Sequence, residues 1–108
     1  MAWVLLIIAG LLETVWAASM KLSEGFTRPL PSAVTAVAAA ASFWLLALAM
    51  RGLPLGVAYP IWVGIGAVGS VAVGAVLLGE GVTPLRIGSL LLIVAGIAGL
   101  SLAEARSA

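Results

Sequence analysis

Apolar residues run along this chain in four long stretches that short polar segments separate. The first stretch, Trp3 to Met20, is interrupted by a single charge, and the stretches at residues 29–50, 52–79 and 87–103 carry none. A helix that crosses a bilayer needs about 17–25 predominantly apolar residues, so each stretch can cross once. The pattern therefore predicts four transmembrane helices, at about residues 3–20, 31–50, 56–78 and 84–103.

Composition agrees with this pattern and indicates an integral membrane protein. Of the 108 residues, 64% are hydrophobic and 8% are charged, and the mean hydropathy is +1.30. Ordinary soluble domains carry about 25% charged residues. Because the polar connections are short, we expect one all-α membrane domain over residues 1–108. Any binding site must then lie within the membrane-embedded part.

Cysteine, histidine and aspartate are absent from the sequence. Their absence excludes disulfides, thiolate chemistry, Cys–His metal sites and acid–base catalysis by histidine. The net charge of +1 gives no electrostatic reason to expect a nucleic-acid partner. The spacing Gly64-x-Gly66-x-x-Gly69 matches a dinucleotide-binding fingerprint, but it lies within an apolar helix rather than between a strand and a helix. We expect no cofactor and no metal.

Glu13 is the residue that points most directly to a function. It is the only charged side chain among the first twenty residues, and it lies near the midpoint of the first predicted helix. An acid at bilayer depth costs about 2.5–3.5 kcal/mol on insertion scales, and such residues usually face a cavity or a partner. Four thin helices enclose little volume, so we expect a partner subunit. The other acids, which lie at or beyond the segment ends and so argue against an enzyme, are Glu24, Glu80 and Glu104.

The surroundings of Glu13 in the first helix suit a binding site. Gly10, Glu13 and Ala17 lie on one helical face, and Trp16 is one turn away. Small residues beside a carboxylate leave room for a ligand or a neighbouring helix. Ser42, in the alanine-rich second segment, either faces such a site or bonds back to its own helix.

Local signals mark the ends of the later helices. Ser32, which follows two prolines, is a plausible N-cap for the second helix. In the third segment Tyr59 and Trp62 share a face. Thr83 can cap the fourth helix, with Pro84 in its first position. The small residues of that helix suit helix–helix contact and predict a role in dimerisation; they are Gly88, Gly96 and Gly99.

The basic residues give almost no orientation bias, although Lys and Arg normally set the cytoplasmic side. With four crossings, Arg51, Arg106 and the terminal amine share one side of the membrane, and Lys21, Arg28 and Arg86 share the other. A weak bias can still select one orientation. Alternatively, copies insert both ways and pair antiparallel, which would supply the in-plane two-fold axis on which many transporters are built.

Several motifs together carry a resemblance to a known family. They are the opening through Glu13, Val15-Trp16-Ala17, Lys21, Gly25-Phe26-Thr27-Arg28, Leu53-Pro54, Ala58-Tyr59, Ile61-Trp62 and Gly64-Ile65-Gly66-Ala67-Val68-Gly69. Over essentially its whole length the chain resembles the small multidrug resistance family of four-helix transporters, and within it the guanidinium-exporter subtype. The resemblance implies an antiparallel homodimer of dual topology in the inner (plasma) membrane. It also implies proton-coupled antiport of guanidinium or small guanidinyl cations by alternating access.

The resemblance further implies roles for five residues. Glu13 matches the central carboxylate, which binds proton and substrate competitively. Trp16 and Ser42 match positions that orient this carboxylate by hydrogen bonding, and they favour the guanidinium subtype over the quaternary-ammonium one. Tyr59 and Trp62 match third-helix aromatic residues that line the pocket and its gate.

Two residues depart from the family pattern. Pro60 stands where alanine is common, and Val63 where a small hydroxyl residue is common. Because both flank Trp62, they leave the substrate range open. The alternatives are an exporter of quaternary-ammonium or other multidrug cations, a subunit of a paired heterodimer, and a non-transporting membrane subunit or pore-former in which Glu13 pairs with a partner's cation.

Overall fold

The computed structural model describes residues 1–107, and side chains up to residue 103. This part of the chain forms four helices and no strand: α1 (Ala2–Leu22), α2 (Pro29–Ala49), α3 (Leu55–Leu77) and α4 (Pro84–Ser107). All four are long and apolar enough to cross a membrane, which confirms the predicted all-α fold with four transmembrane helices. α1 and α4 are longer than predicted, and α2 and α3 begin and end slightly earlier. The side chains of Glu104 and Arg106 lie outside the described residues.

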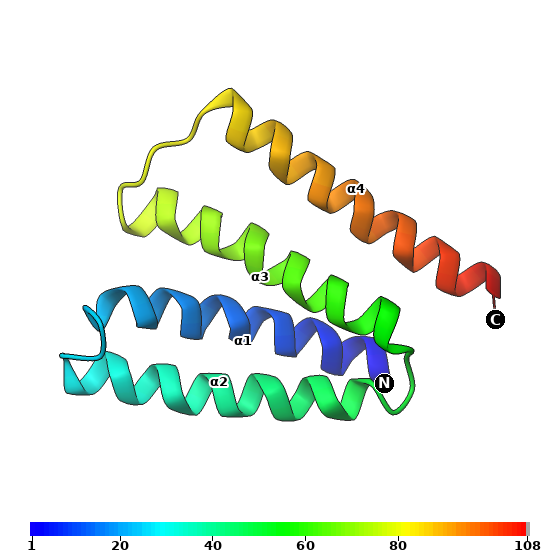
Figure 1. Ribbon diagram of the computed structural model, residues 1–108, viewed down its shortest axis with the longest axis horizontal. Coiled ribbons are helices and arrows are strands. Elements are labelled where there is room, and N and C mark those ends of the chain that lie inside the picture. Colours follow the sequence, from blue (N-terminus) through cyan, green and yellow to red (C-terminus); the bar gives the residue numbers. More distant parts are fainter. Residues whose placement is uncertain (108) are drawn as a thin grey trace.

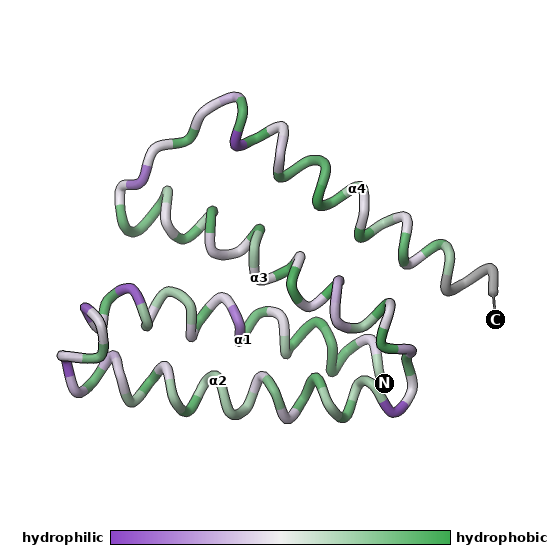
Figure 2. Tube along the Cα trace, viewed as in Figure 1, coloured by the Kyte–Doolittle hydropathy of each residue, from purple (hydrophilic) through white to green (hydrophobic). Residues whose placement is uncertain are grey.

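The helices are arranged around α1 and α3. α1 lies between α2 and α3, and among the described residues α4 packs against α3 alone (Figure 1). Hydrophilic residues gather at the connections, with one short hydrophilic stretch near the middle of α1 (Figure 2). α4 leaves most of its large apolar side chains exposed. The outer surface of α4 is therefore available to lipid or to another subunit.

The core lies where the N-terminal half of α1 meets the end of α2 and the beginning of α3. It consists of buried apolar side chains from these three helices and the loop before α3: Leu6, Ala9, Leu46, Ala49, Leu53, Val57, Ala58, Ile61 and Trp62. In a bilayer such packing holds the helices together mainly by van der Waals contact and close approach. Small side chains and glycines are therefore as important here as large ones. At Gly10 of α1, for example, an added Cβ would lie 2.7 Å from Ile65 of α3.

The start of α2 differs from the sequence prediction. Arg28 is the N-cap residue, so the predicted N-cap at Ser32 is wrong. The hydroxyl of Ser32 instead donates a hydrogen bond to the carbonyl of Arg28. Proline is favoured in the first helical turn, where a backbone N–H has no partner within the helix. Pro29 and Pro31 therefore start α2 rather than delay it.

The start of α4 follows the sequence prediction. Pro84 is its first residue, and Thr83 Oγ1 accepts a hydrogen bond from the backbone N–H of Arg86 at 3.2 Å. This contact satisfies one of the backbone donors that a helix leaves free at its N-terminus. The capping role predicted for Thr83 is confirmed.

Pro60 lies in the second turn of α3, where it removes one backbone donor and its ring crowds the carbonyl of Gly56. α3 nevertheless continues through Pro60 as one element of 23 residues. At 1.5 Å per residue it spans about 35 Å, enough for a hydrocarbon core of about 30 Å. The rest of the apolar stretch forms the connections on either side of α3.

Candidate functional site

Glu13 lies near the middle of α1 and faces α3. Its Oε1 atom is buried and has no hydrogen-bond partner in the described part of the chain. The residue opposite is Gly66, where an added Cβ would overlap the Glu13 carboxylate. Glycine at this position is therefore what makes room for the acid. A buried carboxylate oxygen without a donor is costly, so the position is suited to bind a proton or a cation.

A cavity of about 240 Å³ opens beside Glu13 between α1 and α3. Its lining comes from these two helices and consists of Glu13, Trp16, Ala17, Val63, Gly66, Ala67 and Ser70. The Nε1 atom of Trp16 is also buried and without a hydrogen-bond partner among the described residues. The cavity region therefore combines an unpaired acceptor with an unpaired donor. Val63, one of the two departures from the family pattern, lines this cavity, and Pro60 does not.

Ser42 is fully buried on α2 and connects three helices. Its hydroxyl donates a hydrogen bond to the carbonyl of Ala9 on α1 at 2.7 Å, and it accepts one from Nε1 of Trp62 on α3 at 3.0 Å. The alternative that Ser42 bonds back to its own helix is therefore wrong. Within the described single chain, neither Ser42 nor Trp16 donates to Glu13. Ser42 instead fixes the position of Trp62 relative to α1.

Four aromatic rings form a row from the Glu13 cavity to the beginning of α3. The ring centroids of Trp16 and Phe43 are 6.1 Å apart, those of Phe43 and Trp62 are 5.7 Å apart, and those of Trp62 and Tyr59 are 5.7 Å apart. Trp62 is buried, whereas Tyr59 and Phe43 are about half exposed. Tyr59 and Trp62 do not line the Glu13 cavity in this chain. They are joined to it through Phe43 and Trp16.

Sequence reasoning missed Phe43, Gly66 and Ser70 as parts of this region. For Gly66 and Ser70 a signal was present, since they lie four residues apart and so share a face of α3 with Val63 and Ala67. The fit of Gly66 against Glu13 depends on how α1 and α3 pack, which the sequence does not state. Phe43 gave no such signal, because its contacts with two tryptophans arise from the packing of three helices.

Comparison with known proteins assigns the chain to a family. The family model described as Small Multidrug Resistance protein matches residues 1–93. The guanidinium exporter of Yersinia pseudotuberculosis serotype I (strain IP32953) is 59% identical over 104 residues, which cover 96% of this chain and 100% of that protein. The guanidinium exporters of Escherichia coli (strain K12) and Citrobacter freundii are each 55% identical over 102 residues, which cover 94% of this chain and 97% of theirs.

The three relatives match over nearly the whole chain, and the family model matches α1, α2, α3 and the first part of α4. The relatives are exporters, and the family is one of transporters rather than enzymes. With four helices that can cross a bilayer, the chain is a multi-pass protein of the inner (plasma) membrane. It belongs to the Small Multidrug Resistance family.

Proposed function

We propose that this protein exports guanidinium or small guanidinyl cations in exchange for protons. The observation that carries the proposal is the buried, unpaired carboxylate oxygen of Glu13 beside a cavity between α1 and α3. A protonated carboxyl group is neutral and cannot attract a cation as a carboxylate does. A proton and a cation therefore compete for the same group, and their exchange is coupled.

The chemistry of the cavity supports a small planar cation. Guanidinium presents N–H donors in a plane, which suits a carboxylate acceptor in a two-point contact. A cavity of about 240 Å³ holds such an ion, since a water molecule occupies about 30 Å³ in the liquid. The aromatic row that begins at Trp16 can add a cation–π contribution. The relatives at 55–59% identity that are named guanidinium exporters support the same substrate class.

We further propose that two copies form an antiparallel homodimer of dual topology. The near balance of Lys and Arg between the two sides supports insertion in both orientations. The exposed apolar surface of α4 supports a helix–helix contact between copies. In such a dimer two Glu13 side chains face a shared cavity. The unpaired Nε1 donor of Trp16 is available to orient them, whereas the hydroxyl of Ser42 is already bonded to Ala9 and Trp62. Alternating access then follows when the two subunits exchange conformations. A paired heterodimer is the alternative assembly.

The test is uptake of guanidinium by the purified protein in liposomes under an imposed pH gradient. We expect saturable uptake that the pH gradient drives, and Glu13→Gln should abolish it because the neutral amide neither releases a proton nor attracts a cation. The matched control is Glu24→Gln, which changes an exposed acid in the loop after α1.

Each other result of this experiment favours a named alternative. Absence of uptake by the purified wild type would favour a non-transporting subunit or a member of a heterodimer. Preferential uptake of bulky hydrophobic cations from a substrate panel would favour a multidrug exporter. Proton-coupled uptake that persists in Glu13→Gln would contradict the role of the acid.

A further inference from the structure

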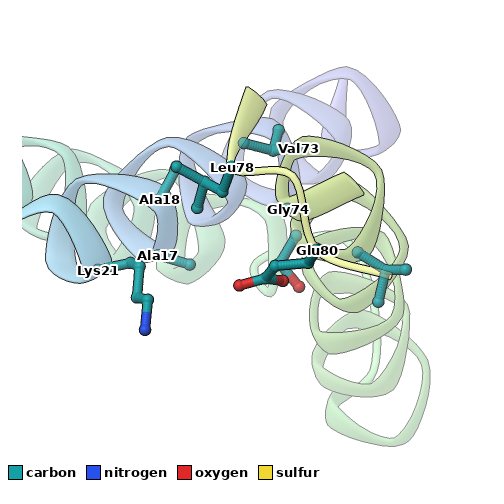
Figure 3. Close-up of a pocket in the computed structure, with 9 residues that line it drawn as sticks. Ala17, Ala18, Lys21, Val73, Gly74, Leu78 and Glu80 are labelled. Carbon is teal, nitrogen blue, oxygen red and sulfur yellow. The ribbon is translucent and has the colours of Figure 1, made fainter. Parts of the chain in front are cut away.

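A second cavity, of about 210 Å³, lies between α1 and α3 near their C-terminal ends. It shares Ala17 and Ser70 with the Glu13 cavity, so the two cavities adjoin. Toward the membrane surface it is lined by Lys21 and Glu80, which lie on opposite sides of the opening (Figure 3). Hollows therefore extend along one side of the α1–α3 contact, from Glu13 toward the C-terminal ends of both helices.

A wider hollow of about 510 Å³ continues outward from this opening. It is again lined by Lys21 and Glu80, and also by Glu24 and Arg28 of the loop between α1 and α2. Three adjoining hollows thus lead from the middle of α1 to the loops. A small cation that reaches Glu13 from this end would pass between Lys21 and Glu80.

The carboxylate of Glu80 is held at this opening by contacts with the end of α3. The backbone N–H of Glu80 donates a hydrogen bond to the carbonyl of Gly74 at 2.9 Å. The carboxylate lies against the same glycine, because an added Cβ at Gly74 would overlap Oε1 of Glu80. In the described part of the chain Glu80 forms no ion pair within 4.0 Å, whereas Glu24 pairs with Arg28 at 3.7 Å. Glu80 therefore presents at the opening a negative charge that no salt bridge neutralises in the described part of the chain.

We propose that Glu80 is a docking group for the transported cation on its path between the membrane surface and Glu13. The inference rests on the proposed function. It adds a path from the membrane surface to Glu13, and it assigns to Glu80 an effect on how readily the cation reaches Glu13. A negative charge at the mouth of a cleft with low-dielectric walls raises the local concentration of cations. Lys21, on the opposite side of the opening, limits this attraction. This balance suits a path, because a cation must bind at the opening strongly enough to enter and weakly enough to move on.

The test is the initial rate of guanidinium uptake into liposomes by Glu80→Gln, measured over a range of substrate concentrations. At low ionic strength KM should rise about threefold, the effect of a unit charge about 6 Å from the cation in water, and the maximal rate should stay unchanged. At high ionic strength the difference should vanish, because the Debye length falls from about 30 Å at 0.01 M salt to about 3 Å at 1 M. Lys21→Gln should lower KM under the low-salt conditions. Glu80→Asp keeps the charge and should keep KM close to that of the wild type.

The matched control is Arg51→Gln, which removes an exposed charge in the α2–α3 connection, at the other end of the helices and outside the three hollows. Its KM should stay near the wild-type value. The proposal is overturned if Glu80→Gln has a wild-type KM at low salt, if it lowers the maximal rate alone, or if Arg51→Gln shifts KM by a similar factor. Those results would contradict only the role of Glu80. The proposed function would still stand if the wild type takes up guanidinium and Glu13→Gln does not. A wild type that takes up no guanidinium overturns both proposals.

Discussion

The carboxylate of Glu13 and the indole of Trp16 each leave a buried polar atom without a partner in the described single chain. Unsatisfied buried groups are costly, and proteins retain them where a ligand, water or partner completes the contact. Glu13 and Trp16 lie one turn apart on α1 and line the same cavity. In the proposed function, a ligand, a second subunit or both would supply partners for these two atoms, and this would be the physical basis for binding.

The fit of Glu13 against Gly66 gives the first residue-scale prediction. In Gly66→Ala the new methyl group would take the space of the Glu13 carboxylate, so the acid must move away from α3. We expect guanidinium uptake in liposomes to fall about tenfold or more, as a loss of about 1.4 kcal/mol or more of binding would cause. Circular dichroism should show an unchanged helix content, because alanine favours helices more than glycine does.

The matched control for this variant is Gly56→Ala in the first turn of α3, where an added Cβ meets no atom within 4 Å. It should transport like the wild type. Wild-type uptake by Gly66→Ala would show that the carboxylate does not need its place against α3.

Ser42 gives a second prediction at this scale. Ser42→Ala leaves the carbonyl of Ala9 and Nε1 of Trp62 without their buried partner, which should destabilise the fold by about 1–3 kcal/mol. Because Trp62 is then no longer fixed, guanidinium affinity should fall as well. Chemical unfolding in detergent and a binding titration measure the two effects separately.

Ser89→Ala is the matched control, because Ser89 is exposed and its hydroxyl bonds to the carbonyl of Leu85 in its own helix. It should change neither stability nor affinity. A stability loss in Ser42→Ala with unchanged affinity would assign Ser42 a purely structural role.

At the scale of whole helices, length and apolar composition were sufficient to predict four membrane crossings. The cap at Thr83 was also predictable, since its signal lies within four consecutive residues. The start of α2 was not, because Pro29 and Pro31 can either precede a helix or occupy its first turn, and local sequence allows both. Contacts between helices could not be predicted, because they join residues far apart in the sequence. The hydrogen bond from Ser42 to Ala9, for example, spans 33 residues.

The predicted role of α4 in dimerisation can be tested on its small residues. At Gly96 an added Cβ meets nothing within 4 Å of the described chain, so Gly96→Leu should leave the single-chain fold intact. If copies pack through α4, the larger side chain should hold the helices apart and weaken the dimer about tenfold or more. Energy transfer between labelled copies in liposomes, diluted with lipid, measures this association.

Val76→Leu is the matched control, because Val76 is 79% exposed and lies on α3. It should associate like the wild type. Unchanged association of Gly96→Leu would place the contact between copies on another surface of the molecule.

At the scale of the whole molecule, the four helices do not enclose the Glu13 cavity. The Glu13 cavity lies between α1 and α3, and α4 covers only one side of α3. A second copy could close this cavity and bring another Glu13 to it. The isolated acid led us to expect a partner from the sequence, because four thin helices enclose too little volume to shield it, and this expectation stays a prediction. The geometry of the proposed shared site could not be predicted, because it would depend on contacts between two chains.

The proposed coupling of proton and cation would be a property of the whole assembly, and it yields the last prediction. If guanidinium binds only the ionised form of Glu13, its dissociation constant should rise as pH falls through the titration of this group, approaching about tenfold per pH unit at the acid end. Binding should also release protons, which a weakly buffered titration of the purified protein detects. Glu24→Gln should keep the same pH dependence. Because coupling requires that the two ligands exclude one another, an affinity independent of pH, or binding without proton release, would leave Glu13 as a cation site but remove the physical basis for exchange.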